Sequence, residues 1–354
     1  MKPTSFALSF LIAAALAAPL AIAQIPVNSD QPAGAGVQAG ADVREPLVLG
    51  LCRKPPAPPA TRRPAFRPRP PGPYPYAVQA IPGVIAADQR WKLIWVHNGN
   101  NADGIIGQPD GGILAAQNDS SDVVKISPDG RTSVVYRDTE TGGELSQSKA
   151  GELFIVERSL IPSVWELSPE RKLFADSYDG QPLECQGRGA MDDPAALHTG
   201  GVYFAYGGLY YASPQGTVTK LFNQDVNGVI LSPDETRLYY ASFGKLYAGD
   251  VGADGLLSNQ RLLADIPGGG NDGATIDSDG RVYVTGYPGV RVFDRDGKYL
   301  GTIPAPRNLI SVAFSGPDKK TLFVVAYVLE RGQHGLDEIY TIPTVAQGYL
   351  GRAR

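Results

Sequence analysis

The sequence predicts an all-β protein, a six-bladed β-propeller with four-stranded blades that follows a signal peptide and a disordered Pro-rich linker. Two observations in the region after residue 91 predict the propeller. A hairpin motif recurs six times at intervals of about 35 to 50 residues, which is the spacing of propeller blades. The same region lacks the 3.6-residue apolar period of an amphipathic helix. We therefore divide the chain into the signal peptide (1–23), the linker (24–80) and the propeller (81–354).

The first residues have the layout of a signal peptide. Lys2 precedes an apolar run over residues 6–16, and Ala-Ile-Ala at 21–23 before Gln24 has the small-x-small pattern that a signal peptidase cleaves. A transmembrane anchor is the alternative, but the run is shorter than the ~20 apolar residues that span a bilayer. No later segment is apolar enough to span. We expect a periplasmic or secreted protein whose mature chain begins near Gln24.

Residues 24–80 show no strand or helix period and few aromatic or β-branched residues, so we expect them to be disordered. Between Arg53 and Tyr76 the linker combines five further basic residues with many prolines and has no acidic residue. Such a segment is an extended, solvated spacer. Its charge also allows weak contact with an anionic envelope polymer. The net charge of the whole chain is only −4, which gives no reason to expect a nucleic-acid partner.

The chain has two cysteines, too few for a disulfide scaffold. Cys52 and Cys185 can pair in an oxidising compartment, but the sequence does not fix the distance between them. Whether they form a bridge stays open at this point.

Each of the six repeats reads as a hairpin with a Gly- or Asp-containing turn. The first halves begin at residues 109, 149, 199, 233, 278 and 317, and the second halves at 123, 164, 208, 245, 290 and 338. The last repeat shows only three strands, while residues 91–96 form a strand with no repeat of its own. We expect this strand to supply the missing outer strand and close the ring. A two-sheet sandwich is the rival architecture, but it does not require six equal copies.

Polar residues recur at one position of the repeat, eight residues before the turn of each hairpin. These positions, which we call the mouth ring, are Asp103, Gly143, Asp192, Asn227, Asp272 and Ser311. The rotational symmetry of a propeller brings equivalent positions together, so the ring should line one mouth of the central channel. Four of its six members are Asp or Asn, and buried carboxylates are costly unless a cation accompanies them.

We therefore predict one divalent metal ion bound by Asp103, Asp192, Asn227 and Asp272, with Gly143 and Ser311 lining the mouth. An all-oxygen donor set favours Ca²⁺ first, with Zn²⁺, Mn²⁺ or Mg²⁺ as alternatives. The competing interpretation is that Asp and Asn at strand ends cap backbone N–H groups. No organic cofactor is expected, because the glycine-rich segment 268–273 precedes a strand and does not join a strand to a helix.

The residues around this ring resemble a known family over roughly residues 100 to 345. Asn227-Gly228 leading into Val-Ile-Leu-Ser-Pro-Asp, Asn271-Asp272-Gly273, and a Tyr-Asp-Gly turn at 178–180 are similar to motifs of the senescence marker protein, gluconolactonase and luciferin-regenerating enzyme family. The resemblance implies metal-dependent hydrolysis of a lactone or ester, with Asp272 as both metal ligand and proton acceptor.

Two ring positions depart from the family pattern. Asp103 stands where the family has Glu, and Asp192 stands where it usually has Asn. Donor oxygens survive both changes, but the shorter side chain and the added charge can alter metal choice and substrate.

The leading hypothesis is a metal-dependent hydrolase that opens a sugar lactone or similar cyclic ester. A non-catalytic, metal-stabilised propeller that binds a ligand or a protein is the rival from another class, since a fold does not fix a function. A metal-free condensing enzyme of the strictosidine-synthase type is disfavoured by the acidic ring.

Overall fold

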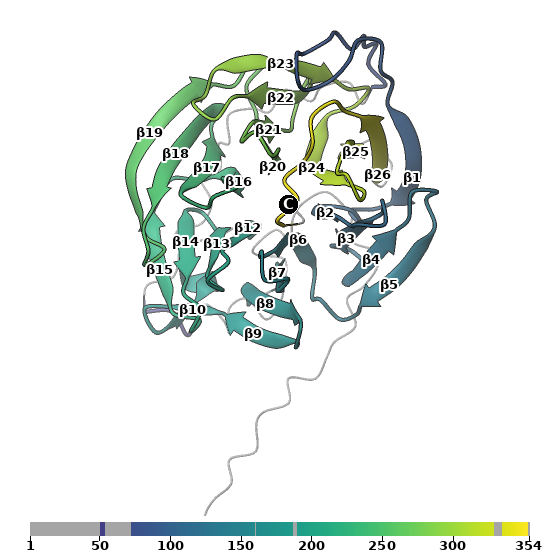
Figure 1. Ribbon diagram of the computed structural model, residues 1–354. Helices are drawn as coiled ribbons and strands as arrows, with labels where there is room; N and C mark the ends of the chain where they lie inside the picture. The colour runs from purple at the N-terminus through teal and green to yellow at the C-terminus, as the bar shows by residue number, and fades with distance from the viewer. Residues whose placement is uncertain (1–49, 54–71, 160, 187–189, 329–334, 353–354) are drawn as a thin grey trace, which may run out of the picture. The chain divides into compact units, whose positions relative to one another are not determined.

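The computed structural model describes residues 50–53, 72–159, 161–186, 190–328 and 335–352. This part of the chain forms six four-stranded antiparallel sheets arranged around a central axis (Figure 1), which confirms the six-bladed propeller. The predicted signal peptide and most of the predicted linker lie outside the described residues. No helix among the described residues has the length and apolar character needed to cross a membrane.

The first three blades follow one another along the chain, each running from an inner to an outer strand. Blade 1 holds β2 (Ile105–Gly107), β3 (Ile113–Gln117), β4 (Asp122–Ile126) and β5 (Thr132–Tyr136). Blade 2 holds β6 (Gly142–Gln147), β7 (Leu153–Glu157), β8 (Ser163–Ser168) and β9 (Lys172–Ala175). Blade 3 holds β12 (Asp192–Ala196), β13 (Val202–Ala205), β14 (Leu209–Ala212) and β15 (Val218–Phe222).

The last three blades complete the ring. Blade 4 holds β16 (Asn227–Leu231), β17 (Arg237–Ser242), β18 (Lys245–Val251) and β19 (Leu257–Asp265). Blade 5 holds β20 (Ala274–Ile276), β21 (Val282–Val284), β22 (Gly289–Phe293) and β23 (Tyr299–Pro304). Blade 6 holds β24 (Leu309–Ser315), β25 (Thr321–Val328), β26 (Leu336–Pro343) and β1 (Lys92–Asn98).

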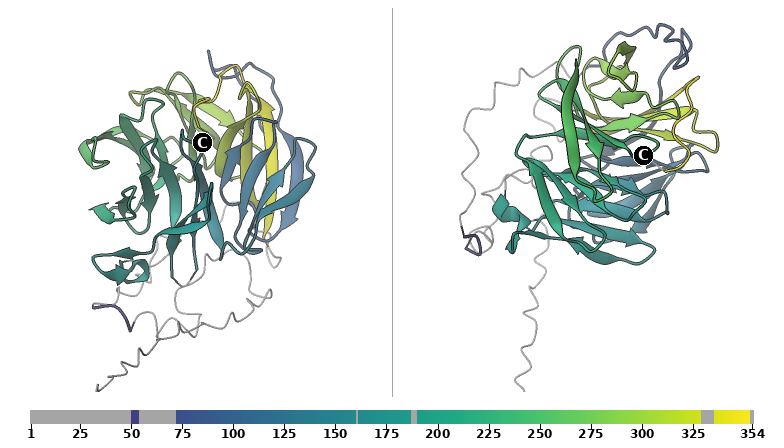
Figure 2. Two further views of the ribbon diagram at one scale, coloured as in Figure 1. Left: turned by 60° about the horizontal axis from the view of Figure 1, so that its bottom comes forward. Right: turned by 60° about the vertical axis from the view of Figure 1, so that its left-hand side comes forward.

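β1 closes the ring, as the sequence predicts. It pairs antiparallel with β26, so the first strand of the fold is the outer strand of the last blade. Figure 2 shows this blue strand beside the yellow strands from two further sides. The inner strands β2, β6, β12, β16, β20 and β24 contact one another in this cyclic order. Their first residues therefore face a common axis.

Apolar side chains fill the spaces between the blades. The described residues form six core clusters, each between two neighbouring sheets; between blades 1 and 2, for example, Ile106 and Leu114 pack with Leu145 and Ile155. Inner and middle strands are covered on both faces and read as apolar runs, as in β7, whose five residues are all buried. Outer strands such as β5 are mostly exposed.

The turn that follows each inner strand carries a residue with positive φ at the same place. These residues are Gly111, Gly151, Gly200, Glu235, Gly280 and Lys319. Glycine adopts this conformation at little cost, whereas a residue with a side chain is strained there. Glu235 (φ 59°) and Lys319 (φ 46°) are therefore exceptions, and both side chains are buried.

Two segments of the predicted linker are described, and both contact the propeller. Tyr74 N donates to Pro306 O at 2.7 Å, and Val78 is buried in the core cluster of blades 5 and 6. Cys52 forms a disulfide with Cys185 in the 3₁₀ helix η1 (Leu183–Gln186), which follows the short strands β10 (Ser177–Tyr178) and β11 (Gln181–Pro182). The open question of the cysteine pair is thereby answered.

Candidate functional site at one mouth of the channel

The structure brings the polar members of the mouth ring together. β12 begins at Asp192 and β16 at Asn227, while Asp103 and Asp272 lie two residues before β2 and β20. The Asn227 side chain hydrogen-bonds Asp272, and the charge of Asp272 acts on Asp192. Counting back from the turns thus identified residues that meet in space, because each inner strand runs from this mouth to its turn.

The other two ring positions have structural roles. Ser311 is fully buried, and its Oγ accepts a hydrogen bond from Ile105 N at 3.4 Å, which links blade 6 to blade 1. Gly143 leaves a gap in blade 2, because a Cβ added there would collide with the Nε, Cζ and Cδ atoms of Arg158. The side chain that lies at this ring position therefore comes from another residue.

Arg158 follows the last residue of β7 and extends into the mouth ring. Its Nη1 contacts the Asp103 carboxylate and its Nη2 the Asp192 carboxylate, while Nε donates to Met191 O at 2.7 Å. The side chain is 9 % exposed, compared with 15 % for Asp103 and 24 % for Asp192. One guanidinium thus joins ring residues of two different blades.

Glu144 and Asp193 are further acidic residues at this mouth, each one residue after a ring position. Asp193 is buried with φ 46°, and its Oδ2 accepts a hydrogen bond from Gly228 N at 2.6 Å. The Glu144 carboxylate lies over Gly104, where a Cβ would approach Oε2 to 2.5 Å. β-Bulges at the starts of β6 and β12 shift the register here, which turns these neighbours toward the ring.

The acidic residues raise one another's pKa values. Burial is the main cause that raises the pKa of Asp272 well above its usual range, and the negative charges of Asp193 and Glu144 add to it. Burial likewise raises the pKa of Asp192, with the charge of Asp193 next in importance. Burial lowers the pKa of Arg158 to about 10, so the guanidinium keeps its charge at neutral pH. The mouth is therefore a partly buried cluster of acids around one fixed cation.

Comparison with known proteins shows which family this chain resembles. Residues 186–327 match the SMP-30/Gluconolactonase/LRE-like region. The resemblance predicted from the sequence is thus confirmed. The gluconolactonase of Zymomonas mobilis is 24 % identical over 285 residues, which cover 69 % of this chain and 78 % of that protein.

Solved structures related to this family share the fold. A gluconolactonase from Xanthomonas campestris superposes with a TM-score of 0.58 at 20 % identity, covering 73 % of this chain and 90 % of that one. A calcium-binding regucalcin from Agrobacterium tumefaciens gives a TM-score of 0.55 at 20 % identity, covering 70 % and 92 %. At this level of identity the likeness concerns the fold.

The divalent ion implied by the SMP-30/gluconolactonase resemblance can be tested against these side chains. Oxygen donors suit a hard cation. However, the carboxylates of Asp103 and Asp192 form ion pairs with Arg158. The other two predicted ligands, Asn227 and Asp272, are hydrogen-bonded to each other. Among the described residues, no group of three or more His, Cys, Asp or Glu side chains is arranged to hold a metal ion. The four predicted ligands, as they are placed here, do not fit one shared ion.

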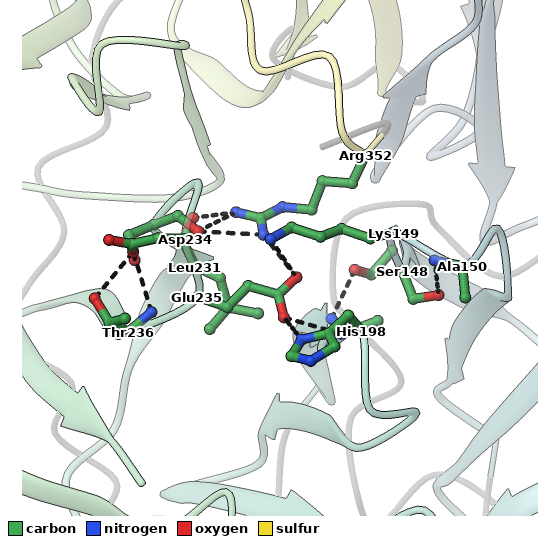
Figure 3. Close-up of polar contacts among 12 residues, drawn as sticks. Ser148, Lys149, Ala150, His198, Leu231, Asp234, Glu235, Thr236 and Arg352 are labelled. Atoms are coloured by element: carbon green, nitrogen blue, oxygen red, sulfur yellow. Dashed lines mark hydrogen bonds and ion pairs between the residues drawn. The ribbon is translucent and has the colours of Figure 1, made fainter. Parts of the chain in front are cut away.

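A second cluster of charged and basic side chains lies at the opposite end of the channel. We call it the tail-end cluster, and its members are Lys149, His198, Glu235, Lys319 and Arg352. Arg352, in the C-terminal segment, lies 3.5 Å from Glu235 Oε1, and Lys149 Nζ lies 3.6 Å from the same atom. His198 Nδ1 lies 2.5 Å from Glu235 Oε2. Figure 3 shows the three basic side chains pointing toward the Glu235 carboxylate.

The C-terminal segment 344–352 contacts this end through several blades. Gly348 forms a β-bridge with Asp277 of blade 5, and Lys319 Nζ of blade 6 donates to Tyr349 O at 2.8 Å. Figure 1 shows the yellow C-terminal segment running to the centre of the ring. Because the tail lies at this end, the partly exposed side chains of the mouth ring make the other end the candidate functional site.

Sequence reasoning missed Arg158, Glu144 and Asp193. Two signals were present: Asp193 and Glu144 directly follow ring positions, and Gly143 interrupts a ring that is otherwise polar. A glycine at a position where its equivalents carry polar side chains indicates that another group uses the space. The sequence alone does not show which residue that is, because Arg158 comes from the loop after the neighbouring strand.

Proposed function

We propose that this protein hydrolyses a lactone at the mouth ring. The observation that carries the proposal is Asp272, a partly buried carboxyl with a raised pKa, at the channel mouth of a propeller that matches the gluconolactonase family over residues 186–327. Family relatives named as gluconolactonases support a cyclic sugar ester as the substrate class.

The reaction adds water to the ester carbonyl and breaks the ring C–O bond, which gives a hydroxy acid. In this proposal Asp272 accepts the proton of the attacking water and returns a proton to the leaving alkoxide. A carboxyl with a raised pKa is a stronger base when ionised than an ordinary Asp. Asn227 hydrogen-bonds this carboxyl and orients it.

The divalent ion expected from the sequence, with Ca²⁺ first, is the alternative to a mouth ring without a metal. The regucalcin from Agrobacterium tumefaciens supports it, since that relative is described as calcium-binding. The pairing of Arg158 with two of the four predicted ligands argues against it. No step above requires the ion.

We also propose that the protein works in the periplasm or outside the cell. The Cys52–Cys185 disulfide supports this location, because disulfides persist in oxidising compartments. The apolar N-terminal run with its cleavage pattern points the same way.

A panel of substrates tests the proposal. Sugar δ- and γ-lactones, alkyl lactones and linear esters of matched size are offered to the purified mature protein, and acid release is followed with a pH indicator. We expect turnover of at least one sugar lactone and slower turnover of linear esters. If the folded protein hydrolyses no cyclic ester above the rate of buffer alone, the proposal fails.

A further inference from the structure

Asp103 and Asp192 come from blades 1 and 3, and Arg158 of blade 2 lies between them. We propose that the Arg158 guanidinium is the resident cation of the mouth ring and takes the place that a divalent ion would need between these two carboxylates. The inference concerns metal content and does not depend on the proposed hydrolysis, so either can fail without the other.

The chain makes room for this arrangement. Arg158 directly follows β7, and its side chain passes the ring position of blade 2, which is Gly143. Any larger residue at 143 would overlap the Nε, Cζ and Cδ atoms. The glycine in the ring is thus explained by the path of the arginine, and two independent features of the sequence serve the same contact.

The guanidinium is held by all three of its nitrogens. Nε donates to the carbonyl of Met191, and the two Nη atoms contact the carboxylates of Asp103 and Asp192. Paired charge-assisted hydrogen bonds of this kind are strong and directional. Moving Arg158 out of the ring would separate a largely buried charge from these partners, which is costly.

Three of the other oxygen-bearing side chains at the mouth also have partners within the protein. Asn227 hydrogen-bonds Asp272, and Asp193 accepts from Gly228 N. Asn118 Nδ2 donates to Asp103 Oδ2 at 2.8 Å. A divalent ion that entered between Asp103 and Asp192 would stand beside a fixed positive charge and would be repelled by it. The guanidinium thus offsets the charge of the two carboxylates that it contacts.

The first test uses the wild-type protein. The mature protein is dialysed against EDTA or against Ca²⁺ or Mn²⁺, its metal content is measured by mass spectrometry, and its Tm is recorded. We expect well below one ion per chain and the same Tm in all three buffers. A stoichiometric ion, or a Tm that falls in EDTA and recovers with Ca²⁺ or Mn²⁺, overturns the proposal.

The second test removes the cation. Arg158→Met leaves the carboxylates without their partner, so we expect the Tm to fall by roughly 10 °C in EDTA. We expect Ca²⁺ or Mn²⁺ to bind at about one ion per chain and to restore several degrees, because binding to the folded state stabilises it. Arg158→Gln, which keeps a polar side chain, provides a milder version of the same change.

The matched control is Arg352→Met, which removes a buried guanidinium at the tail end, where a single carboxylate faces several cations. It should lower the Tm without creating a metal site. If Arg158→Met and Arg158→Gln bind no more metal than Arg352→Met, Arg158 does not stand in for an ion and the proposal is wrong. Should both Arg158 variants fail to fold, the wild-type measurement still decides.

Discussion

Both ends of the channel carry clusters of acidic and basic side chains, but acidic side chains predominate at one end and basic side chains at the other. At the mouth ring one buried guanidinium, that of Arg158, serves Asp103 and Asp192 amid further acids. At the tail end one buried carboxylate, that of Glu235, faces Arg352, Lys149 and His198. The first end keeps partly exposed carboxylates, whereas the second is joined to the C-terminal segment.

The two ends differ in how far their charged groups are paired with other parts of the fold. At the tail end the two strained residues, Glu235 and Lys319, both contact the C-terminal segment. Glu235 and Lys319 occupy left-handed turn positions that are glycines in the other four blades, and their side chains contact Arg352 and Tyr349. Strain that is offset by such contacts belongs to the architecture. The acids of the mouth ring instead repel one another.

The first prediction concerns catalysis at the mouth ring, where we expect the largest change. Asp272→Asn keeps the volume of the side chain but removes the base, so we expect kcat for lactone hydrolysis to fall about 10²- to 10⁴-fold. The Tm should stay within a few degrees of wild type, since no ion pair is broken. Steady-state kinetics and thermal melts measure the two quantities.

Asp265→Asn is the control for Asp272→Asn, because Asp265 is an exposed carboxylate on the outer strand β19. It should change neither quantity. An Asp272→Asn protein that hydrolyses lactone at the wild-type rate would remove Asp272 from the mechanism.

The next effect concerns stability at the tail end. Glu235→Gln leaves the buried charge of Arg352 without its carboxylate, and breaking a buried ion pair in this way costs about 3–5 kcal/mol. We expect a matching loss of unfolding free energy in urea and an unchanged kcat below the transition. Asp296→Asn, which breaks an exposed pair with Arg237, should cost less than about 1 kcal/mol.

A Glu235→Gln protein that loses kcat as well as stability would show that the two ends of the channel are coupled.

The sequence predicted the blades and the mouth ring because both depend on local period. A turn residue recurs in every repeat, and symmetry carries positions such as Asp192 and Asn227 to one place. The sequence could not predict that the Arg158 side chain lies in the mouth ring, because its position depends on the loop after β7 and on the space left at Gly143. Nor could it predict the disulfide of Cys52, since no local pattern fixes where the chain near residue 52 lies.

Gly143 offers a smaller and more selective perturbation of the mouth ring. Gly143→Ala places a methyl group against the Arg158 side chain, and overpacking of this kind costs about 1–3 kcal/mol. We expect Arg158 to shift, with a lower Tm and a lower kcat together. Gly249→Ala is the matched control, because a Cβ at that strand glycine meets its neighbours at ordinary distances of 3.4 and 3.5 Å.

A Gly143→Ala protein that behaves like Gly249→Ala would show that Arg158 does not need the gap.

The smallest expected effect is a pH dependence at the tail end. Burial lowers the pKa of Lys319 to about 8, and the charge of Arg352 adds to this shift. A lysine in the unfolded chain has a pKa of about 10.4, so the unfolded state binds this proton more tightly than the folded state. The stability contribution of Lys319 is therefore complete above about pH 10.4 and is lost as the pH falls through 8.

Lys319→Met removes the titrating group, so its Tm should rise less than that of wild type between pH 7.5 and 10. Melts of both proteins in matched buffers measure this difference, which also cancels the titration of every other group. Two parallel Tm profiles would mean that Lys319 stays charged in its contact with Tyr349 and Arg352 throughout this range.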